Sequence, residues 1–121
     1  MTLNLFGSAS SYLNVPIYNY HGSITVPMIT VDDYVNNNNL EVGLIKVDIE
    51  GAEPLFLEGA KNTIIKQKPI LLLSIYHNAH DFFELKPLIE SWGVDYRYRI
   101  YRPTIETATS EILLIAEPNQ Q

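Results

Sequence analysis

Three carboxylates and a glycine follow directly on an apolar stretch near the middle of this 121-residue chain. The apolar stretch covers residues 44–49, and the charged side chains are Asp48, Glu50 and Glu53, set around Gly51. A β-branched apolar run that stops at charges and glycine, before a helical pattern, predicts a buried strand that leads into a helix. In open α/β sheets, ligands bind beyond the carboxyl ends of the strands. We therefore expect these carboxylates at the functional edge of a sheet.

A second polar cluster follows the next apolar segment. Residues 70–76 are almost wholly apolar and end at Tyr76 and His77. Two buried strands joined through a helix form a right-handed βαβ unit, in which the two strand ends lie side by side. The sequence therefore predicts that His77 faces the loop that begins at Asp48.

These residue types suit proton transfer from a hydroxyl group. A carboxylate beside a hydroxyl can act as a general base or hold the hydroxyl, and an imidazole can take its proton at neutral pH. We expect Asp48, Glu50 and His77 as catalytic residues, and Glu53 and Tyr76 as substrate-binding residues. A structural alternative stands beside each role. Asp48 can cap the following helix, the two glutamates can favour its dipole, His77 can be a hydrogen-bonded structural histidine, and Tyr76 can simply pack.

Carboxylates and an imidazole are also ligand types for divalent metals. One cluster of this kind is a weak signal in a sequence, so we assign no metal ligand at this stage.

Three segments precede the first of these strands. Residues 1–25 are poor in charge, rich in Ser, Asn and Tyr, and interrupted by glycine and proline, so we expect an irregular N-terminal segment. Residues 24–31 are β-branched and predict an extended piece. Thr30 or Asp32 then caps a short helix that ends in the asparagines of residues 36–39, which suit left-handed backbone conformations.

The segments after the carboxylates predict alternating helices and strands. Gly59 is expected to split the first helix into two, and a helix over residues 79–92 is expected to kink before Pro87. Residues 96–101 and 112–116 read as the last two strands. The side chains expected to pack the first helix on the sheet are Leu55, Phe56, Leu57, Ala60, Ile64 and Ile65.

Composition limits the function classes. An apolar content of 46% is enough for one globular domain, residues 1–121. The formal charge of −6 argues against a nucleic-acid surface. Three arginines alternate with tyrosines at Arg97, Arg99 and Arg102, a pattern that suits either a site for an anionic ligand or a polar outer strand. No apolar run approaches the roughly 18 residues of a membrane span. We expect a cytoplasmic protein, because the chain has no cysteine and no secretory pattern.

The central motif resembles the FkbM-type methyltransferase family. The resemblance is specific in LIKVDIEGAEPLFLEGA, residues 44–60, with Pro69 and the strand after it. It extends upstream to residues 26–33, which end in a Thr-hydrophobic-Asp-Asp segment, and downstream to residues 74–77, with Asp81 and, in the last strand, Glu111. Together these matches cover about residues 24–117.

This resemblance implies a fold and an activity. Members of the family are similar to S-adenosylmethionine-dependent enzymes with a seven-stranded sheet, and most methylate hydroxyls of sugars, polyketides or related metabolites. The implied fold is α/β: a partial Rossmann-like, doubly wound sheet of the class I methyltransferase type, mostly parallel with an antiparallel terminal strand. The strands at residues 44–49 and 70–76 would be the fourth and fifth of that sheet.

The chain also departs from the family pattern. No glycine-rich loop follows a first strand, and the acidic residue that would hold the cofactor ribose is missing. The chain resembles the C-terminal half of such an enzyme. We expect O-methylation of a small-molecule hydroxyl; the alternative is a non-catalytic fragment that acts as an assembly or binding module. An uncovered edge at residues 44–49 predicts self-association or a missing N-terminal half.

Overall fold

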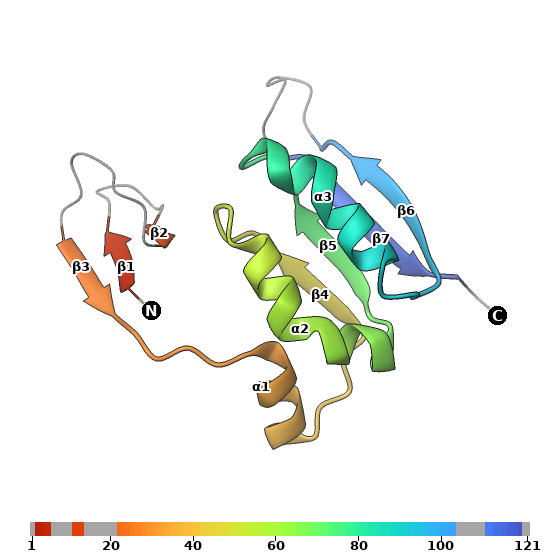
Figure 1. The fold of residues 1–121 in the computed structure, drawn as a ribbon, viewed down its shortest axis with the longest axis horizontal. Helices are drawn as coiled ribbons and strands as arrows, with labels where there is room; N and C mark the ends of the chain where they lie inside the picture. The colour runs from red at the N-terminus through yellow and green to blue at the C-terminus, as the bar shows by residue number, and fades with distance from the viewer. Residues whose placement is uncertain (1, 6–10, 14–21, 104–110, 120–121) are drawn as a thin grey trace.

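The computed structural model describes residues 2–5, 11–13, 22–103 and 111–119. These residues form two sheets and three helices (Figure 1). The class is mixed α/β, as the sequence predicts. No helix of the described residues is both long enough and apolar enough to cross a membrane.

The N-terminal segment contains strands that the sequence analysis did not place. β1 (Thr2–Leu5), β2 (Ser11–Leu13) and β3 (Gly22–Thr25) form an antiparallel sheet in the order β2-β1-β3. The expectation of an irregular segment over residues 1–25 therefore misses three short strands. Strands of three or four residues give almost no periodic signal, and their stability depends on pairing between segments that are distant in sequence.

The second sheet carries the predicted βαβ unit. Its strands are β4 (Leu44–Val47), β5 (Ile70–Ser74), β6 (Tyr96–Tyr101) and β7 (Leu113–Pro118), in the order β4-β5-β7-β6. β4 and β5 pair in parallel, whereas β7 is antiparallel to both of its neighbours. Only one of the three pairings is parallel, so the expected mostly parallel sheet is not confirmed.

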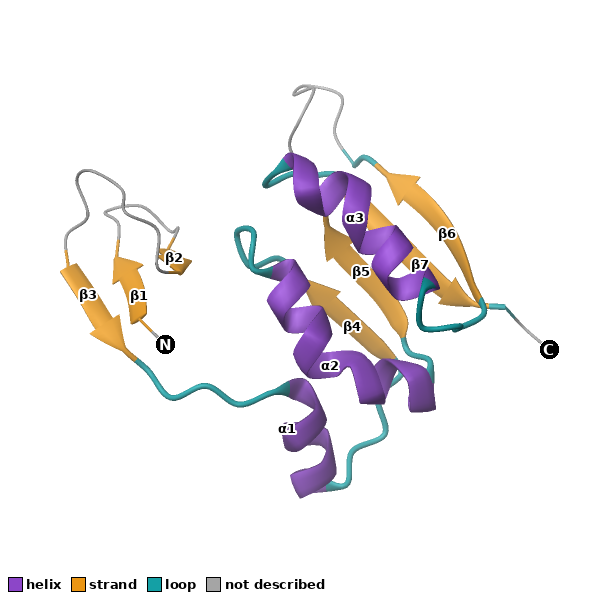
Figure 2. Ribbon diagram, viewed as in Figure 1, coloured by secondary structure: helices purple, strands orange, loops and turns teal. Residues whose placement is uncertain are grey.

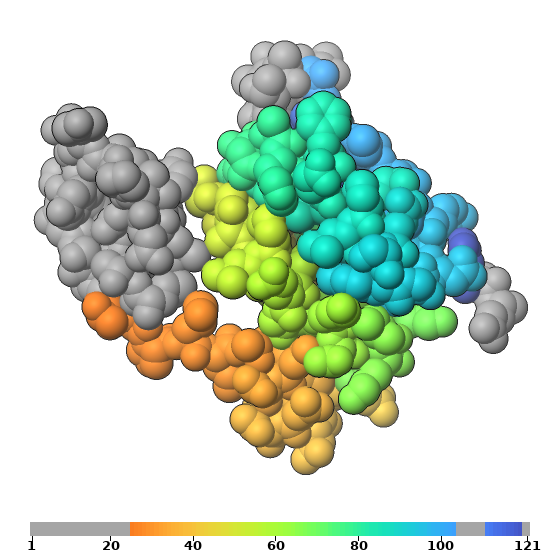
Figure 3. All heavy atoms as spheres, in the orientation of Figure 1, coloured from red at the N-terminus to blue at the C-terminus, as the bar shows by residue number. Residues whose placement is uncertain are grey.

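The helices form one layer on this sheet. α2 (Glu53–Gln67) and α3 (Ala79–Glu90) both lie on the same face, and α1 (Val31–Asn38) lies beside α2 (Figure 2). In the space-filling view, α2 and α3 cover the sheet on the visible side (Figure 3). A doubly wound sheet has helices on both faces, and the described residues supply only one such layer.

The core lies between that helical layer and the sheet. Leu55, which was expected to face the sheet, is 53% exposed, because two residues along a helix correspond to about 200° and place it opposite Leu57. The core residues are Val47, Leu57, Ala60, Ile64, Leu71, Leu73, Ile75, Leu85, Ile89, Tyr96, Leu114 and Ala116.

The expected break at Gly59 is wrong, and α3 is not broken at Pro87, where the expected kink stays a prediction. α2 runs through Gly59 without interruption, and a Cβ at Gly59 would lie 3.3 Å from Cβ of Thr30. The glycine therefore serves the close approach of α1 to α2. α3 also runs through Pro87, which lies near its end and is exposed, so water can replace the one backbone hydrogen bond that proline removes.

β4 is an edge strand among the described residues. It was expected to be buried on both faces, but Leu44 is 55% exposed and only Val47 is buried. The expected self-association through this edge stays a prediction. At the opposite edge, Arg97 and Arg99 lie 3.2 and 3.5 Å from Glu117, which favours the polar outer strand over an anion site.

Hydrogen bonds of Asp32 connect α1 to α2. The helix cap is Thr30, whose hydroxyl accepts from the backbone N–H of Asp33, and Asn39 ends α1 in the left-handed conformation. Asp32 instead accepts four hydrogen bonds: at 3.0 and 2.9 Å from the backbone and side chain of Asn62, and at 2.7 Å from both the backbone N–H and the hydroxyl of Thr63.

We predict that Asp32→Asn lowers the free energy of unfolding by about 1–3 kcal/mol, because the amide cannot accept all four bonds. Burial raises the pKa of Asp32, but the hydrogen bonds from Thr63 and Asn62 outweigh it and hold the pKa below its usual value. A carboxyl group whose pKa is lowered in the folded protein adds to the free energy of unfolding above about pH 4. This stabilisation is lost as the pH falls through the folded-state pKa.

Urea unfolding at a series of pH values checks this. The difference in free energy of unfolding between the original protein and Asp32→Asn should become smaller below about pH 4. Glu84→Gln, at an exposed position, is the matched control. Equal stabilities at pH 7 would contradict the role of Asp32.

Candidate active site

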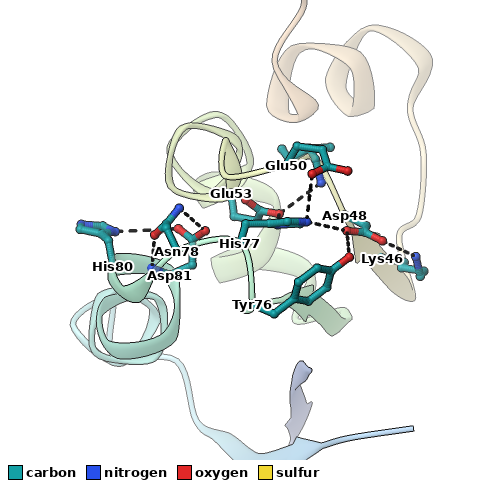
Figure 4. Close-up of polar contacts among 10 residues, drawn as sticks. Lys46, Asp48, Glu50, Glu53, Tyr76, His77, Asn78, His80 and Asp81 are labelled. Carbon is teal, nitrogen blue, oxygen red and sulfur yellow. Dashed lines mark hydrogen bonds and ion pairs between the residues drawn. The ribbon is translucent and has the colours of Figure 1, made fainter. Parts of the chain in front are cut away.

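The parallel pairing of β4 and β5 brings the predicted polar residues to one edge of the sheet. Val47 lies opposite Leu73 near the ends of the two strands, and the backbone leaves the sheet just after each of these residues. Figure 4 shows the side chains of the two loops turned toward one another around the imidazole of His77.

His77 is the centre of the cluster. Its Nδ1 lies 3.0 Å from Oε1 of Glu53, and its Nε2 lies 3.4 Å from Oδ1 of Asp48 and 3.5 Å from Oε2 of Glu50. The His77 side chain is only 8% exposed. Nε2 is buried and makes no hydrogen bond with any described residue, because the two carboxylate contacts are ion-pair distances without hydrogen-bond geometry.

Glu53 holds the imidazole from the inner side. The glutamate is fully buried in the first turn of α2, and its Oε1 also accepts from the backbone N–H of Ile49 at 3.1 Å. A buried carboxylate needs such donors. Since Oε1 can only accept, the short contact places the ring proton on Nδ1, and the lone pair of Nε2 then faces Asp48 and Glu50.

Asp48 lies on the solvent side of the cluster. The Tyr76 hydroxyl donates to its Oδ1 at 3.3 Å, and Nζ of Lys46 lies 3.9 Å from its Oδ2. The alternative that Asp48 caps α2 is wrong, because the cap position is Ala52, which makes no side-chain cap bond.

Tyr76 remains a hydrogen-bond donor at neutral pH. Burial, together with the negative charges of Asp48, Glu50 and Glu111, raises the pKa of the Tyr76 hydroxyl to about 12. Glu111, which was expected in the last strand, instead precedes β7, and its φ of 60° is in the left-handed region.

A tight turn directs Glu50 toward the imidazole. Glu50 and Gly51 have φ of 58° and 93°, a conformation that costs a residue with a side chain about 1 kcal/mol or more. A Cβ at Gly51 would lie 3.1 Å from Nδ2 of Asn78. Glycine at position 51 therefore suits both the left-handed backbone and the close approach of the loop after β4 to Asn78 in the loop after β5.

The neighbouring residues of α3 support the second loop. Asn78 caps α3 by accepting from the backbone N–H of Asp81 at 2.8 Å, and its amide donates to Oδ2 of Asp81 at 2.7 Å. Burial and the nearby Glu53 raise the pKa of Asp81. His80 is 63% exposed at its side chain, as expected of a surface residue, and His21 lies outside the described residues.

The structure thus brings together all five residues predicted from the sequence as site residues. Sequence reasoning missed the ion pair of Lys46 and the capping role of Asn78. The Asn-x-x-Asp spacing before a helical pattern was a usable capping signal for Asn78. The spacing of two residues between Lys46 and Asp48 was a usable signal for their ion pair, because residues i and i+2 of an extended segment share one face.

Comparison with known proteins identifies the family and a similar fold. A sequence model of the Methyltransferase FkbM domain matches residues 1–100. The fold is similar to the crystal structure of Methyltransferase FkbM from Methylobacillus flagellatus KT, with a TM-score of 0.63 and 31% sequence identity. No curated protein matches the chain.

The chain belongs to the FkbM methyltransferase family, because the family match covers most of its length. The structural match covers 72% of this chain and 22% of the Methylobacillus protein. The chain therefore spans about a fifth of the length of that relative.

We predict that Gly51→Ala destabilises the protein by about 1–2 kcal/mol, because alanine resists the left-handed conformation and its Cβ crowds Asn78. Gly43→Ala is the matched control, since no atom lies within 4 Å of a Cβ there and its φ is ordinary. Thermal and urea unfolding of both variants should separate them. Equal stabilities would show that the turn adapts to a side chain.

Proposed function

We propose that this chain supplies the acceptor side of an S-adenosylmethionine-dependent methyltransferase that methylates a hydroxyl oxygen. The observation that carries the proposal is the convergence of Nε2 of His77 with carboxylate oxygens of Asp48 and Glu50 at 3.4 and 3.5 Å. With the ring proton on Nδ1, all three atoms are acceptors. A substrate hydroxyl supplies the donor that this cluster lacks.

His77 would remove the hydroxyl proton. The hydroxyl donates to Nε2, and the proton passes to Nε2 as the oxygen becomes nucleophilic. The resulting imidazolium keeps its Nδ1–H bond to Glu53 and lies beside the carboxylates of Asp48 and Glu50. Because Glu53 is fully buried, we propose that it acts through His77 rather than by touching the substrate.

Asp48 and Tyr76 would position the acceptor. The side chain of Asp48 is 39% exposed, so it can receive a second hydroxyl of a polyol or sugar-like substrate. The Tyr76 hydroxyl holds the Asp48 carboxylate from one side. A small metabolite with several hydroxyls is the acceptor class that fits these groups, in agreement with the family resemblance.

We propose that the methyl donor is held by elements other than the described residues. Gly51 is the only described glycine in a turn from a strand to a helix, and the space at its Cβ position is filled by Asn78. β4, where the turn starts, has no second neighbour strand in the described part of the sheet. We therefore assign the cofactor to other protein elements and derive no step through it.

A non-catalytic binding module is the less favoured function. A module of that kind has no need of a buried imidazole held by a carboxylate and surrounded by acceptors. Such an arrangement is typical of general-base chemistry.

We predict that the chain alone does not bind S-adenosylmethionine with a dissociation constant below about 10 µM, equivalent to roughly −7 kcal/mol. The physical reason is that the described residues include no glycine-rich loop that could hold the cofactor. Isothermal titration checks this, and a dissociation constant in the low micromolar range would overturn the assignment of the cofactor to other elements.

We predict that His77→Gln and Asp48→Asn lower methyl transfer more than they lower stability. The assay needs these residues joined to cofactor-binding elements, for example in the Methylobacillus relative with its matched segment replaced by this chain. Loss of a general base should reduce the single-turnover rate by about 100-fold or more for His77→Gln. Exposed His80→Gln is the control, and thermal melts of every variant report folding. An unchanged rate in His77→Gln would remove His77 from the reaction.

A further inference from the structure

We infer that the acceptor cluster at the ends of β4 and β5 binds a divalent transition-metal ion through Nε2 of His77, Oδ1 of Asp48 and Oε2 of Glu50. Binding itself stands on the geometry of the cluster and needs no methyl transfer. Its consequence for catalysis rests on the proposed function.

The first observation is the buried, unpartnered nitrogen. The His77 side chain is 92% buried, since 8% of it is exposed, and Nε2 has no hydrogen-bond partner among the described residues. It points at two carboxylate oxygens rather than at a donor (Figure 4). A lone pair on Nε2 that faces two carboxylate oxygens is unfavourable unless a cation or a proton donor lies between them.

The second observation is the spacing of these atoms. Ligands about 2.1 Å from a tetrahedral metal lie about 3.4 Å from each other. The two distances from Nε2 are 3.4 and 3.5 Å. Two of the ligand-to-ligand distances of a tetrahedral site are therefore already present, without movement of the side chains.

The third observation is the support of the imidazole. A metal-binding histidine usually donates its other ring N–H to a carboxylate, which fixes its tautomer and orientation. Glu53 occupies this position at 3.0 Å from Nδ1. One ligand atom each of Asp48, Glu53 and His77 lies within 4.8 Å of the others. Oε2 of Glu53 is buried and has no hydrogen-bond partner among the described residues. Oε1 of Glu53, however, bonds Ile49 and Nδ1 of His77, which ties this glutamate to the ring nitrogen opposite Nε2. We therefore assign Glu53 as a positioning residue and Glu50 as the third ligand.

The ligand set selects the class of ion. One imidazole and two carboxylates favour a borderline ion such as Zn²⁺ over a hard ion that prefers oxygen ligands, such as Mg²⁺, Ca²⁺ or Mn²⁺. Two carboxylates balance the charge of a dication. The side chains of Asp48 and Glu50 are 39% and 32% exposed, which leaves the outer side of the site open to water or to a substrate hydroxyl.

A cation at this position changes how the hydroxyl is activated. A bound metal lowers the pKa of a coordinated hydroxyl or water. In the loaded protein His77 is a ligand rather than the base, and the proton leaves to solvent at the open side of the site. The products of methyl transfer are the same in both cases.

The test is calorimetric titration of the full chain, free of any affinity tag, with zinc chloride and with manganese chloride. We expect one zinc ion per chain and weaker binding of manganese. His77→Gln should weaken binding at least 100-fold, Asp48→Asn and Glu50→Gln at least 10-fold each, and Glu53→Gln by about 10- to 100-fold as an indirect effect. His80→Gln is the matched histidine control and should bind as the original protein does. Circular dichroism shows that each variant is folded.

Nitrogen-15 spectra of histidine-labelled protein give a readout that does not depend on any variant. On addition of zinc, the Nε2 resonance of His77 should shift while its Nδ1 stays protonated. Absence of binding at 1 mM metal, about −4 kcal/mol or weaker, or binding that His77→Gln leaves unchanged, would overturn the inference.

The two proposals fail separately. A chain that binds no metal, while His77→Gln still stops methyl transfer in the joined enzyme, removes the metal site and leaves the proposed function. Metal binding with the expected variant pattern, but no methyl transfer to any hydroxyl by the joined enzyme, supports the site and contradicts the proposed function.

Discussion

The buried contact between Glu53 and His77 is the interaction on which the site depends. It joins the first turn of α2 to the loop after β5, with 3.0 Å between Oε1 of Glu53 and Nδ1 of His77. The backbone N–H of Ile49 donates a hydrogen bond to the same Oε1. Removal of either partner would leave a buried polar group without its bond, which costs about 1–3 kcal/mol and more for a charge. The tautomer of His77, and therefore the character of Nε2, follows from this one contact.

Backbone geometry completes what that contact begins. The left-handed turn at Glu50 and Gly51 returns the chain toward His77 and allows it to lie against Asn78. Unfavourable backbone conformations of this kind concentrate at functional sites, where the surrounding structure holds them in place. Further from the site, the four hydrogen bonds of Asp32 fix α1 on α2, and α2 in turn carries Glu53. The cluster is therefore positioned by the turn at Gly51 and by α2, which carries Glu53.

The sequence by itself determined the family, the βαβ unit and the place of the site. These depend on local information: apolar runs that end at charges predict strand ends, and parallel strands joined by a helix must end at the same edge. Asp48 and His77, 29 positions apart, could be placed together on that basis alone. The cap at Thr30 and the left-handed Asn39 are also confirmed, because caps are local features.

Only the tertiary structure decided the roles within the cluster and the course of the chain around it. Whether Asp48 caps a helix or faces an imidazole depends on where the chain turns, and at that turn Gly51 lies so close to the other loop that a Cβ would be 3.1 Å from Nδ2 of Asn78. Gly59 reads locally as a helix break, yet it marks a close contact with Thr30. The order β4-β5-β7-β6 likewise depends on pairing between distant strands. Local patterns predict the long apolar elements, whereas long-range pairing and packing decide the short strands of the N-terminal sheet and what each side chain contacts.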